Sequence, residues 1–204
     1  MGLLGSPLTV VAAAVFESED ASGVALGERV FEDCAFRACR FVGTSFDATR
    51  LSGCVLEDCD LSGAALAGAS LHETRLLRRR PRGVDVAAAR SLRGVVFLDC
   101  VLDDTSWIDA DVPGLVLRGG SAVRACFQGA RLRGADLRRL DLTDALFGGT
   151  DLREADLREA RGYALDPGAN RVAGMRVTWP DAAALLGALG VRLEDGADGP
   201  RGGA

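Results

Sequence analysis

Leucine and phenylalanine recur at every fifth position over most of the chain. The first run extends from Phe31 to Leu76, and all ten of its positions are Leu or Phe. The second run extends from Leu92 to Leu157, and eleven of its fourteen positions are Leu or Phe. Since Leu and Phe make up 36 of the 204 residues, roughly four of these 24 positions would match by chance. The period of five is therefore a property of the fold.

A second column of small residues lies two positions before each of these large residues. It consists mainly of Cys, Thr, Ala and Gly, as in Cys34, Thr44, Ala64 and Ala130, with Arg29, Arg90, Leu115 and Leu140 among the exceptions. A period of five fits neither an α-helix nor a regular strand, but it fits a short extended piece followed by a turn, with both columns facing inward. A corner every five residues closes a square coil every twenty. The pattern predicts an all-β solenoid whose coils stack at about 4.8 Å.

Several five-residue units carry a recognisable motif. Residues 135–139 read Ala-Asp-Leu-Arg-Arg, residues 155–159 read Ala-Asp-Leu-Arg-Glu, and residues 59–63 read Cys-Asp-Leu-Ser-Gly. These units resemble the A(D/N)LXX repeat of pentapeptide-repeat proteins, and the resemblance covers roughly residues 29–162. It implies a right-handed quadrilateral β-helix.

The repeat suggests three segments. Residues 1–162 are expected to form the β-helix. Leu92 lies sixteen positions after Leu76, which is three units plus one. The sequence between them contains Pro81 and Gly83, so a projecting basic loop is expected at about 77–91. Residues 163–194 are expected to form a capping or dimerisation module, with a short helix begun by a capping box at Thr178–Asp181, closed by Gly190, and followed by a strand at 191–194. Residues 195–204 are expected to be a disordered tail.

The composition argues against an enzyme or a metal protein. The chain has one His, His72, and no cluster of nucleophile, base and orienting group, so no cofactor is expected. Five of the six cysteines fall in the small inward column and none forms a C-x-x-C motif, so we expect buried thiols and no bound metal; Cys126 lies outside that column. Free cysteines without a secretion signal predict a cytoplasmic location.

Charge gives the candidate binding residues. The net charge of −5 argues against direct nucleic-acid binding, and no membrane segment is expected. In the repeats, acidic residues twenty positions apart are expected to share a face, although an Asp before the central Leu can also serve only to satisfy turn backbone groups. The candidates for an acidic face are Asp103, Asp104, Asp111, Asp136, Asp141, Asp144, Asp151, Glu154, Asp156 and Glu159. The candidates for a partner-binding loop are Arg78, Arg79, Arg80 and Arg82.

The C-terminal region adds a functional resemblance. From Leu165 to Leu193 the sequence is similar to that of the topoisomerase-protecting pentapeptide-repeat proteins, which include Qnr, MfpA and the albicidin and microcin B17 self-resistance proteins. The resemblance implies a homodimer and a DNA-mimicking rod that binds DNA gyrase or topoisomerase IV and protects it from an antibiotic or toxin. The candidates for the dimer contact are Trp179, Leu185, Leu186, Leu189, Val191 and Leu193. The alternative is a structural scaffold with an unrelated protein partner.

Overall fold

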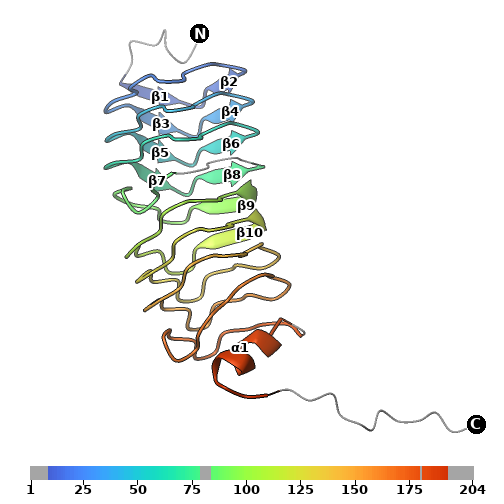
Figure 1. Cartoon of the computed structure of the whole chain (residues 1–204). Helices are drawn as coiled ribbons and strands as arrows, with labels where there is room; N and C mark the ends of the chain where they lie inside the picture. The colour runs from blue at the N-terminus through green and yellow to red at the C-terminus, as the bar shows by residue number, and fades with distance from the viewer. Residues whose placement is uncertain (1–8, 79–83, 180, 193–204) are drawn as a thin grey trace, which may run out of the picture.

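The chain folds into an elongated rod of stacked coils, with one short helix at its C-terminal end (Figure 1). The structure is a computed structural model, and it describes residues 9–78, 84–179 and 181–192. Each coil lies on the next through parallel pairing, which confirms the predicted all-β solenoid.

Two parallel sheets form two neighbouring sides of the rod in its N-terminal half. The first contains β1 (Val10–Ala12), β3 (Val30–Glu32), β5 (Arg50–Ser52) and β7 (Ser70–His72). The second contains β2 (Val15–Glu17), β4 (Ala35–Arg37), β6 (Val55–Glu57), β8 (Arg75–Leu77), β9 (Val96–Val101) and β10 (Val116–Ser121). Partners in register are twenty residues apart, as in Phe31 with Leu51, except across one break in the repeat.

The remaining sides are held by isolated parallel bridges between turns, so the cross-section has four faces, numbered here in chain order. The large inward residues define them. Face 1 contains Val11, Phe31, Leu51, Leu71, Leu92, Val112, Leu132, Leu152 and Val172; face 2 contains Phe16, Phe36, Leu56, Leu76, Phe97, Leu117, Leu137, Leu157 and Val177. Face 3 contains Ala21, Phe41, Leu61, Leu102, Ala122 and Leu142; face 4 contains Leu26, Phe46, Leu66, Val86, Trp107, Phe127 and Phe147.

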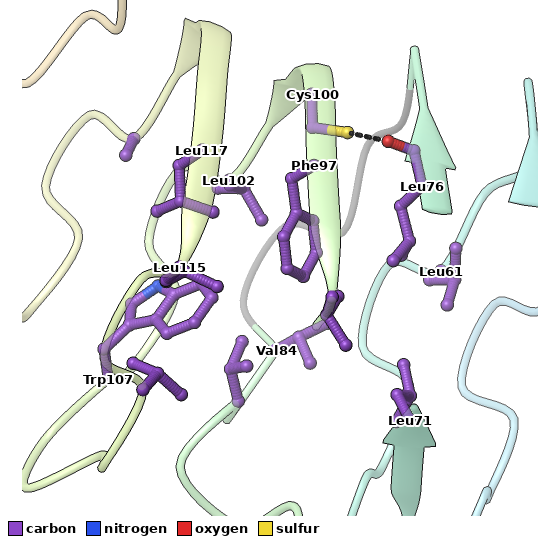
Figure 2. Close-up of a cluster of buried hydrophobic side chains, with 14 of the residues drawn as sticks. Leu61, Leu71, Leu76, Val84, Phe97, Cys100, Leu102, Trp107, Leu115 and Leu117 are labelled. Carbon is purple, nitrogen blue, oxygen red and sulfur yellow. Dashed lines mark hydrogen bonds between the residues drawn. The ribbon is translucent and has the colours of Figure 1, made fainter. Parts of the chain in front are cut away.

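The interior is a narrow column of these side chains, most of them buried. In Figure 2, Phe97 and Leu117 from face 2, Leu102 from face 3 and Trp107 from face 4 lie in one buried cluster. Trp107 is fully buried and its ring stacks on Phe127 at a centroid distance of 5.9 Å. The predicted alternation of large and small inward residues is therefore confirmed.

The small column also makes hydrogen bonds that sequence reasoning missed. The Cys54 thiol donates to the Phe31 carbonyl at 3.3 Å, and the Thr150 hydroxyl donates to the Phe127 carbonyl at 2.8 Å. Cys100 makes the same contact with the Leu76 carbonyl, drawn in Figure 2. Cys and Thr thus recur in this column because they are small and can also donate to a carbonyl of the preceding coil.

The structure at the break in the repeat differs from the loop expected at 77–91. Leu77 belongs to β8, and Val84 and Val86 are each 2% exposed, so the wall of the rod continues through 84–92. Val86 is still in phase with Leu76, which places the extra residue between Val86 and Leu92. There the backbone amides of Arg90 and Ser91 both donate to the Ala69 carbonyl, as in a β-bulge. Residues 79–83 lie outside the described residues.

The C-terminal module is shorter than expected. The coils continue past residue 162, because Arg171 and Arg176 still pair with Asp151 and Asp156 of the preceding coil. The helix α1 spans Ala183–Ala188 and Gly190 follows it with a φ of 77°, as expected. The predicted capping box was wrong: α1 has no side-chain cap, because the Thr178 hydroxyl accepts a hydrogen bond from the Glu159 amide instead.

The predicted strand at 191–194 is not found at its described positions, because Val191 and Arg192 are irregular. Leu193 and the expected tail at 195–204 lie outside the described residues. Within the described part of the chain, no helix is long and apolar enough to cross a membrane.

Candidate protein-binding faces

Charged side chains are sorted by face. Most arginines lie on faces 1 and 2. On face 1 they are Arg29, Arg50, Arg90, Arg93, Arg131, Arg133, Arg153 and Arg171, and on face 2 they are Arg37, Arg75, Arg78, Arg118, Arg138, Arg139, Arg158 and Arg176. Acidic residues alternate with these arginines, so neither face has a uniform sign.

Six of the acidic candidates lie on these two mixed faces. Each is paired with arginine, most often one coil away: Asp111 with Arg131, Asp136 with Arg118 and Arg138, Asp151 with Arg153, Glu154 with Arg133, Asp156 with Arg158 and Arg176, and Glu159 with Arg139. These carboxylates do not form an acidic surface, because each is neutralised locally.

The aspartates before the central Leu also hold the turn. In the turns that follow Asp151 and Asp156, the backbone amides of Arg153 and Arg158 each donate to the carboxylate at 3.2 Å. Both carboxylates are largely buried, and hydrogen bonds from Arg153 lower the pKa of Asp151 to about 2. The structural role of such an Asp in the turn is thereby observed.

The other four acidic candidates lie together on face 3. Asp103 and Asp104 follow Leu102, and Asp141 and Asp144 lie on either side of Leu142 within its unit. Asp104 pairs with Arg124 and Asp141 with Arg161, while Asp103 accepts hydrogen bonds from the Ser121 hydroxyl and the Val123 amide. The described acids of face 3 are Glu19, Asp20, Asp60, Asp103, Asp104, Asp141 and Asp144, and its described cations are Arg40, Arg124 and Arg161.

Face 4 is the uniformly acidic face, and sequence reasoning missed it. Its repeats are 24–28, 44–48, 64–68, 84–88, 105–109, 125–129, 145–149 and 165–169, all described, and they contain no Arg, Lys or His. Their acidic residues are Glu28, Asp47, Asp85, Asp109 and Asp166, all exposed. Summing the charges of every fourth five-residue unit of the sequence, starting from 24–28, would have found this face. It adjoins face 3, where the described acids outnumber the described cations seven to three, so these two faces carry most of the net negative charge of the described residues.

The repeat architecture matches known family models. Residues 30–107 match the model described as a pentapeptide repeat region, and residues 125–161 match the model described as pentapeptide repeats in eight copies. Together the two matches cover more than half of the chain. The chain belongs to the pentapeptide-repeat family.

Solved structures agree with the fold of this pentapeptide-repeat protein. Two trypsin-treated variants of QnrB1, a plasmid-mediated fluoroquinolone resistance protein, superpose with a TM-score of 0.58 at 17% and 18% identity. The first comparison covers 91% of this chain and all of that one, and the second covers 91% and 92%. HetL, involved in heterocyst differentiation regulation in a Nostoc cyanobacterium, is 22% identical over 82% of each chain with a TM-score of 0.36. No curated protein matches the sequence.

Apolar side chains of this pentapeptide-repeat protein are exposed at its C-terminal end. Trp179, Leu189 and Val191 are 70%, 58% and 47% exposed, whereas Leu185 packs against the end of the core. Of the dimer candidates, Leu186 is partly buried and Leu193 lies outside the described residues. Large apolar groups left uncovered at the end of a rod favour a contact with another molecule.

Of the loop candidates, only Arg78 is described. It is exposed on face 2, where its guanidinium pairs with Glu57 and Asp58 at 2.5 Å and 3.0 Å. Arg79, Arg80 and Arg82 lie outside the described residues. Arg78 is therefore part of an ion-pair network on the rod surface.

The cysteines have the burial that the sequence predicts. Cys34, Cys39, Cys54, Cys59 and Cys100 are buried, and Cys126 on face 4 is partly exposed. Burial raises the pKa of the Cys54 thiol to about 11. Among the described residues, no group of His, Cys, Asp and Glu is arranged to hold a metal ion.

Proposed function

We propose that this protein is a non-enzymatic rod that binds DNA gyrase or topoisomerase IV through faces 3 and 4. It would occupy the place of DNA and protect the enzyme from a topoisomerase-poisoning antibiotic or toxin. The observation that carries the proposal is the unequal distribution of charge, because a rod can imitate a polyanion only with a side on which acids outnumber cations. The fold shared with a fluoroquinolone resistance protein supports the same choice of partner.

The charge density of faces 3 and 4 is lower than that of DNA. Duplex DNA carries one negative charge per about 1.7 Å, which is about three charges per coil of 4.8 Å. The described residues of faces 3 and 4 carry twelve acids over eight coils, from none in 120–129 to three in 100–109, and Arg40, Arg124 and Arg161 offset part of the charge on face 3. The protein would therefore compete with DNA through shape and apolar contact as well as charge. Ile108 and Leu146, which are 47% and 54% exposed on face 4, are available for that contact.

The test is a titration of purified gyrase and topoisomerase IV in supercoiling, decatenation and drug-stabilised cleavage assays. We expect inhibition of catalysis or relief of drug-stabilised cleavage near stoichiometric concentrations. A triple variant of face 4 should raise the required concentration at least tenfold: Asp47→Asn, Asp85→Asn and Asp109→Asn. Its matched control changes the same three repeat positions on face 1: Glu32→Gln, Asp33→Asn and Asp111→Asn.

The outcomes separate the two functional hypotheses. If both triple variants weaken the effect equally, charge alone acts and face 4 is not the contact. If the unmodified protein has no effect on either enzyme at high excess, the topoisomerase proposal is wrong and the scaffold alternative replaces it.

We also propose that two copies associate through their C-terminal ends. Trp179, Leu189 and Val191 form the contact, because they are the large apolar side chains exposed next to α1. Sedimentation equilibrium should give a dimer mass for the unmodified protein and a monomer mass for the double variant Trp179→Ser, Leu189→Ser. A monomer mass for the unmodified protein at tens of micromolar would contradict the proposal.

A further inference from the structure

A groove of about 320 Å³ runs along the corner between face 4 and face 1 in the N-terminal half of the rod. Its floor contains Ala48, Gly68 and Ser70, and Arg50 and Arg90 line it. We call it the arginine groove. It borders the acidic surface proposed above for the topoisomerase and shares Glu28 with it, but its cations lie on face 1.

The groove exists because two successive corner residues are small. Ala48 and Gly68 end their face 4 units with left-handed φ values of 56° and 67°, and neither carries a side chain longer than a methyl group. The same corner position one coil earlier is Glu28, which lines the N-terminal end of the groove. The floor is thus open for the height of about two coils.

The bulge in the repeat places Arg90 at the other end. A residue two positions before the central Leu normally points inward, yet Arg90 occupies that position before Leu92 and is exposed. The extra residue between Val86 and Leu92 allows this, because the Arg90 and Ser91 amides share the Ala69 carbonyl. The irregular coil therefore directs a cation into the groove.

The two arginines of the groove differ from those of the ion-pair ladders. Neither Arg50 nor Arg90 makes an ion pair or side-chain hydrogen bond within the described part of the chain, whereas Arg37, Arg78 and Arg131 each pair with a carboxylate of the preceding coil. Arg50 and Arg90 are two coils apart, about 10 Å along the axis. Two long side chains at that spacing can direct their guanidinium groups at one point above Ser70.

Ser70 supplies a hydroxyl at that point. The residue is 7% exposed and lines the groove, and its hydroxyl makes no hydrogen bond with the other described residues. A nearly buried hydroxyl in a groove that two unpaired arginines also line is a donor set for a tetrahedral oxyanion, since arginine binds phosphate oxygens in bidentate fashion.

We propose that the arginine groove binds a single phosphate group, either inorganic phosphate or a small phosphate monoester. Arg50 and Arg90 contact the phosphate oxygens from two sides, and the Ser70 hydroxyl donates from below. Glu28 at the N-terminal end repels a second negative charge further along the groove. The site therefore selects a compact anion over an extended polyanion such as a nucleic-acid strand.

The test is calorimetric titration at constant ionic strength with three probes: inorganic phosphate, glycerol phosphate and a short single-stranded oligonucleotide. We expect saturable binding of the first two at millimolar or lower concentration and none of the third. Tighter binding of glycerol phosphate than of phosphate would identify a monoester as the ligand, and equal or weaker binding would identify free phosphate.

Arg50→Gln and Arg90→Gln should each weaken binding about tenfold, because each removes a charge-assisted contact. Arg75→Gln is the matched control: Arg75, like Arg50, is an exposed arginine at the start of a strand and makes no ion pair among the described residues, but it lies on face 2. Circular dichroism of each variant should show unchanged folding.

Glu28→Gln provides a second variant with the opposite expectation. Removing the carboxylate should allow the oligonucleotide to bind and should leave phosphate binding intact or tighter. The absence of saturable phosphate and ester binding, or an equal loss in Arg75→Gln, would overturn the proposal. A failed gyrase assay would not affect this experiment, because the probes act on the protein alone.

Discussion

The buried hydrogen bond between Trp107 and Thr105 allows a quantitative test of how the interior of the rod satisfies its polar groups. The Trp107 ring nitrogen donates to the Thr105 hydroxyl at 3.0 Å, and that hydroxyl donates to the Leu102 carbonyl at 2.6 Å. Thr105→Val keeps the shape of the side chain but removes both hydrogen bonds. The indole N–H would then be buried without an acceptor, which costs about 1–3 kcal/mol, and the lost hydroxyl contact costs about 1 kcal/mol. We expect a total destabilisation of about 2–4 kcal/mol.

Thr44→Val is the matched control. Thr44 is also fully buried in the small column and donates to one carbonyl, that of Ala21 at 2.7 Å, but it accepts no indole hydrogen bond. Its loss should cost only about 1 kcal/mol. Thr105→Val, Trp107→Phe and the double variant form a double-mutant cycle for the hydrogen bond between the indole N–H and the Thr105 hydroxyl. Its coupling energy should be about 1–2 kcal/mol.

The assay is urea unfolding followed by far-ultraviolet circular dichroism, which does not depend on the tryptophan that is replaced. The reasoning is refuted if Thr105→Val costs no more than Thr44→Val, or if the cycle gives no coupling energy. Either result would mean that the indole nitrogen is satisfied in another way, for example by water within the rod.

Three further predictions follow from the packing. A thiol reagent applied to the native protein should modify Cys126 alone, counted by mass spectrometry; modification of a second thiol before unfolding would contradict the burial of the other five. The hydrogen bonds from Arg153 that lower the pKa of Asp151 stabilise the fold fully above about pH 4, and this stabilisation should be lost as pH falls toward 2; acid titration of Asp151→Asn should show a smaller loss than the unmodified protein. Gly120→Ala should abolish the cooperative thermal transition because the variant no longer folds: its Cβ would overlap a backbone carbonyl of the adjacent coil. The control Gly114→Ala, at a similar φ but with open space around it, should cost only about 1 kcal/mol. Equal melting temperatures for the two variants would show that the coils can separate at this turn.

The core of this protein could be predicted from sequence because its signal is repeated in every coil. The inward columns, the burial of five cysteines and the square cross-section all follow from a period that survives individual exceptions such as Ala122. The ends were harder to predict. Beyond residue 162 the inward positions are filled by residues such as Val172, Met175 and Val177, which pack in the same way but do not match a column of Leu and Phe.

The break in the repeat and the acidic face show a different limit. The arginines of 77–83 and the turn residues Pro81 and Gly83 predict a loop in that segment. The extra residue lies instead among the alanines after Val86. A bulge of one residue is a backbone event that small side chains do not reveal. Residues twenty positions apart do share a face, as Asp136 and Asp156 do, but the acidic candidates combine faces 1, 2 and 3 and include no residue of the arginine-free face 4.

The sorting of charge by face gives the rod a dipole moment perpendicular to its long axis. Among the described residues, faces 3 and 4 carry an excess of negative charge, while most of the arginines lie on faces 1 and 2. The field of a positively charged surface would therefore exert a torque that rolls the molecule about its axis before any side chains touch. Most collisions would then occur with faces 3 and 4 already turned toward the partner. The association rate should depend strongly on ionic strength even though the net charge is only −5.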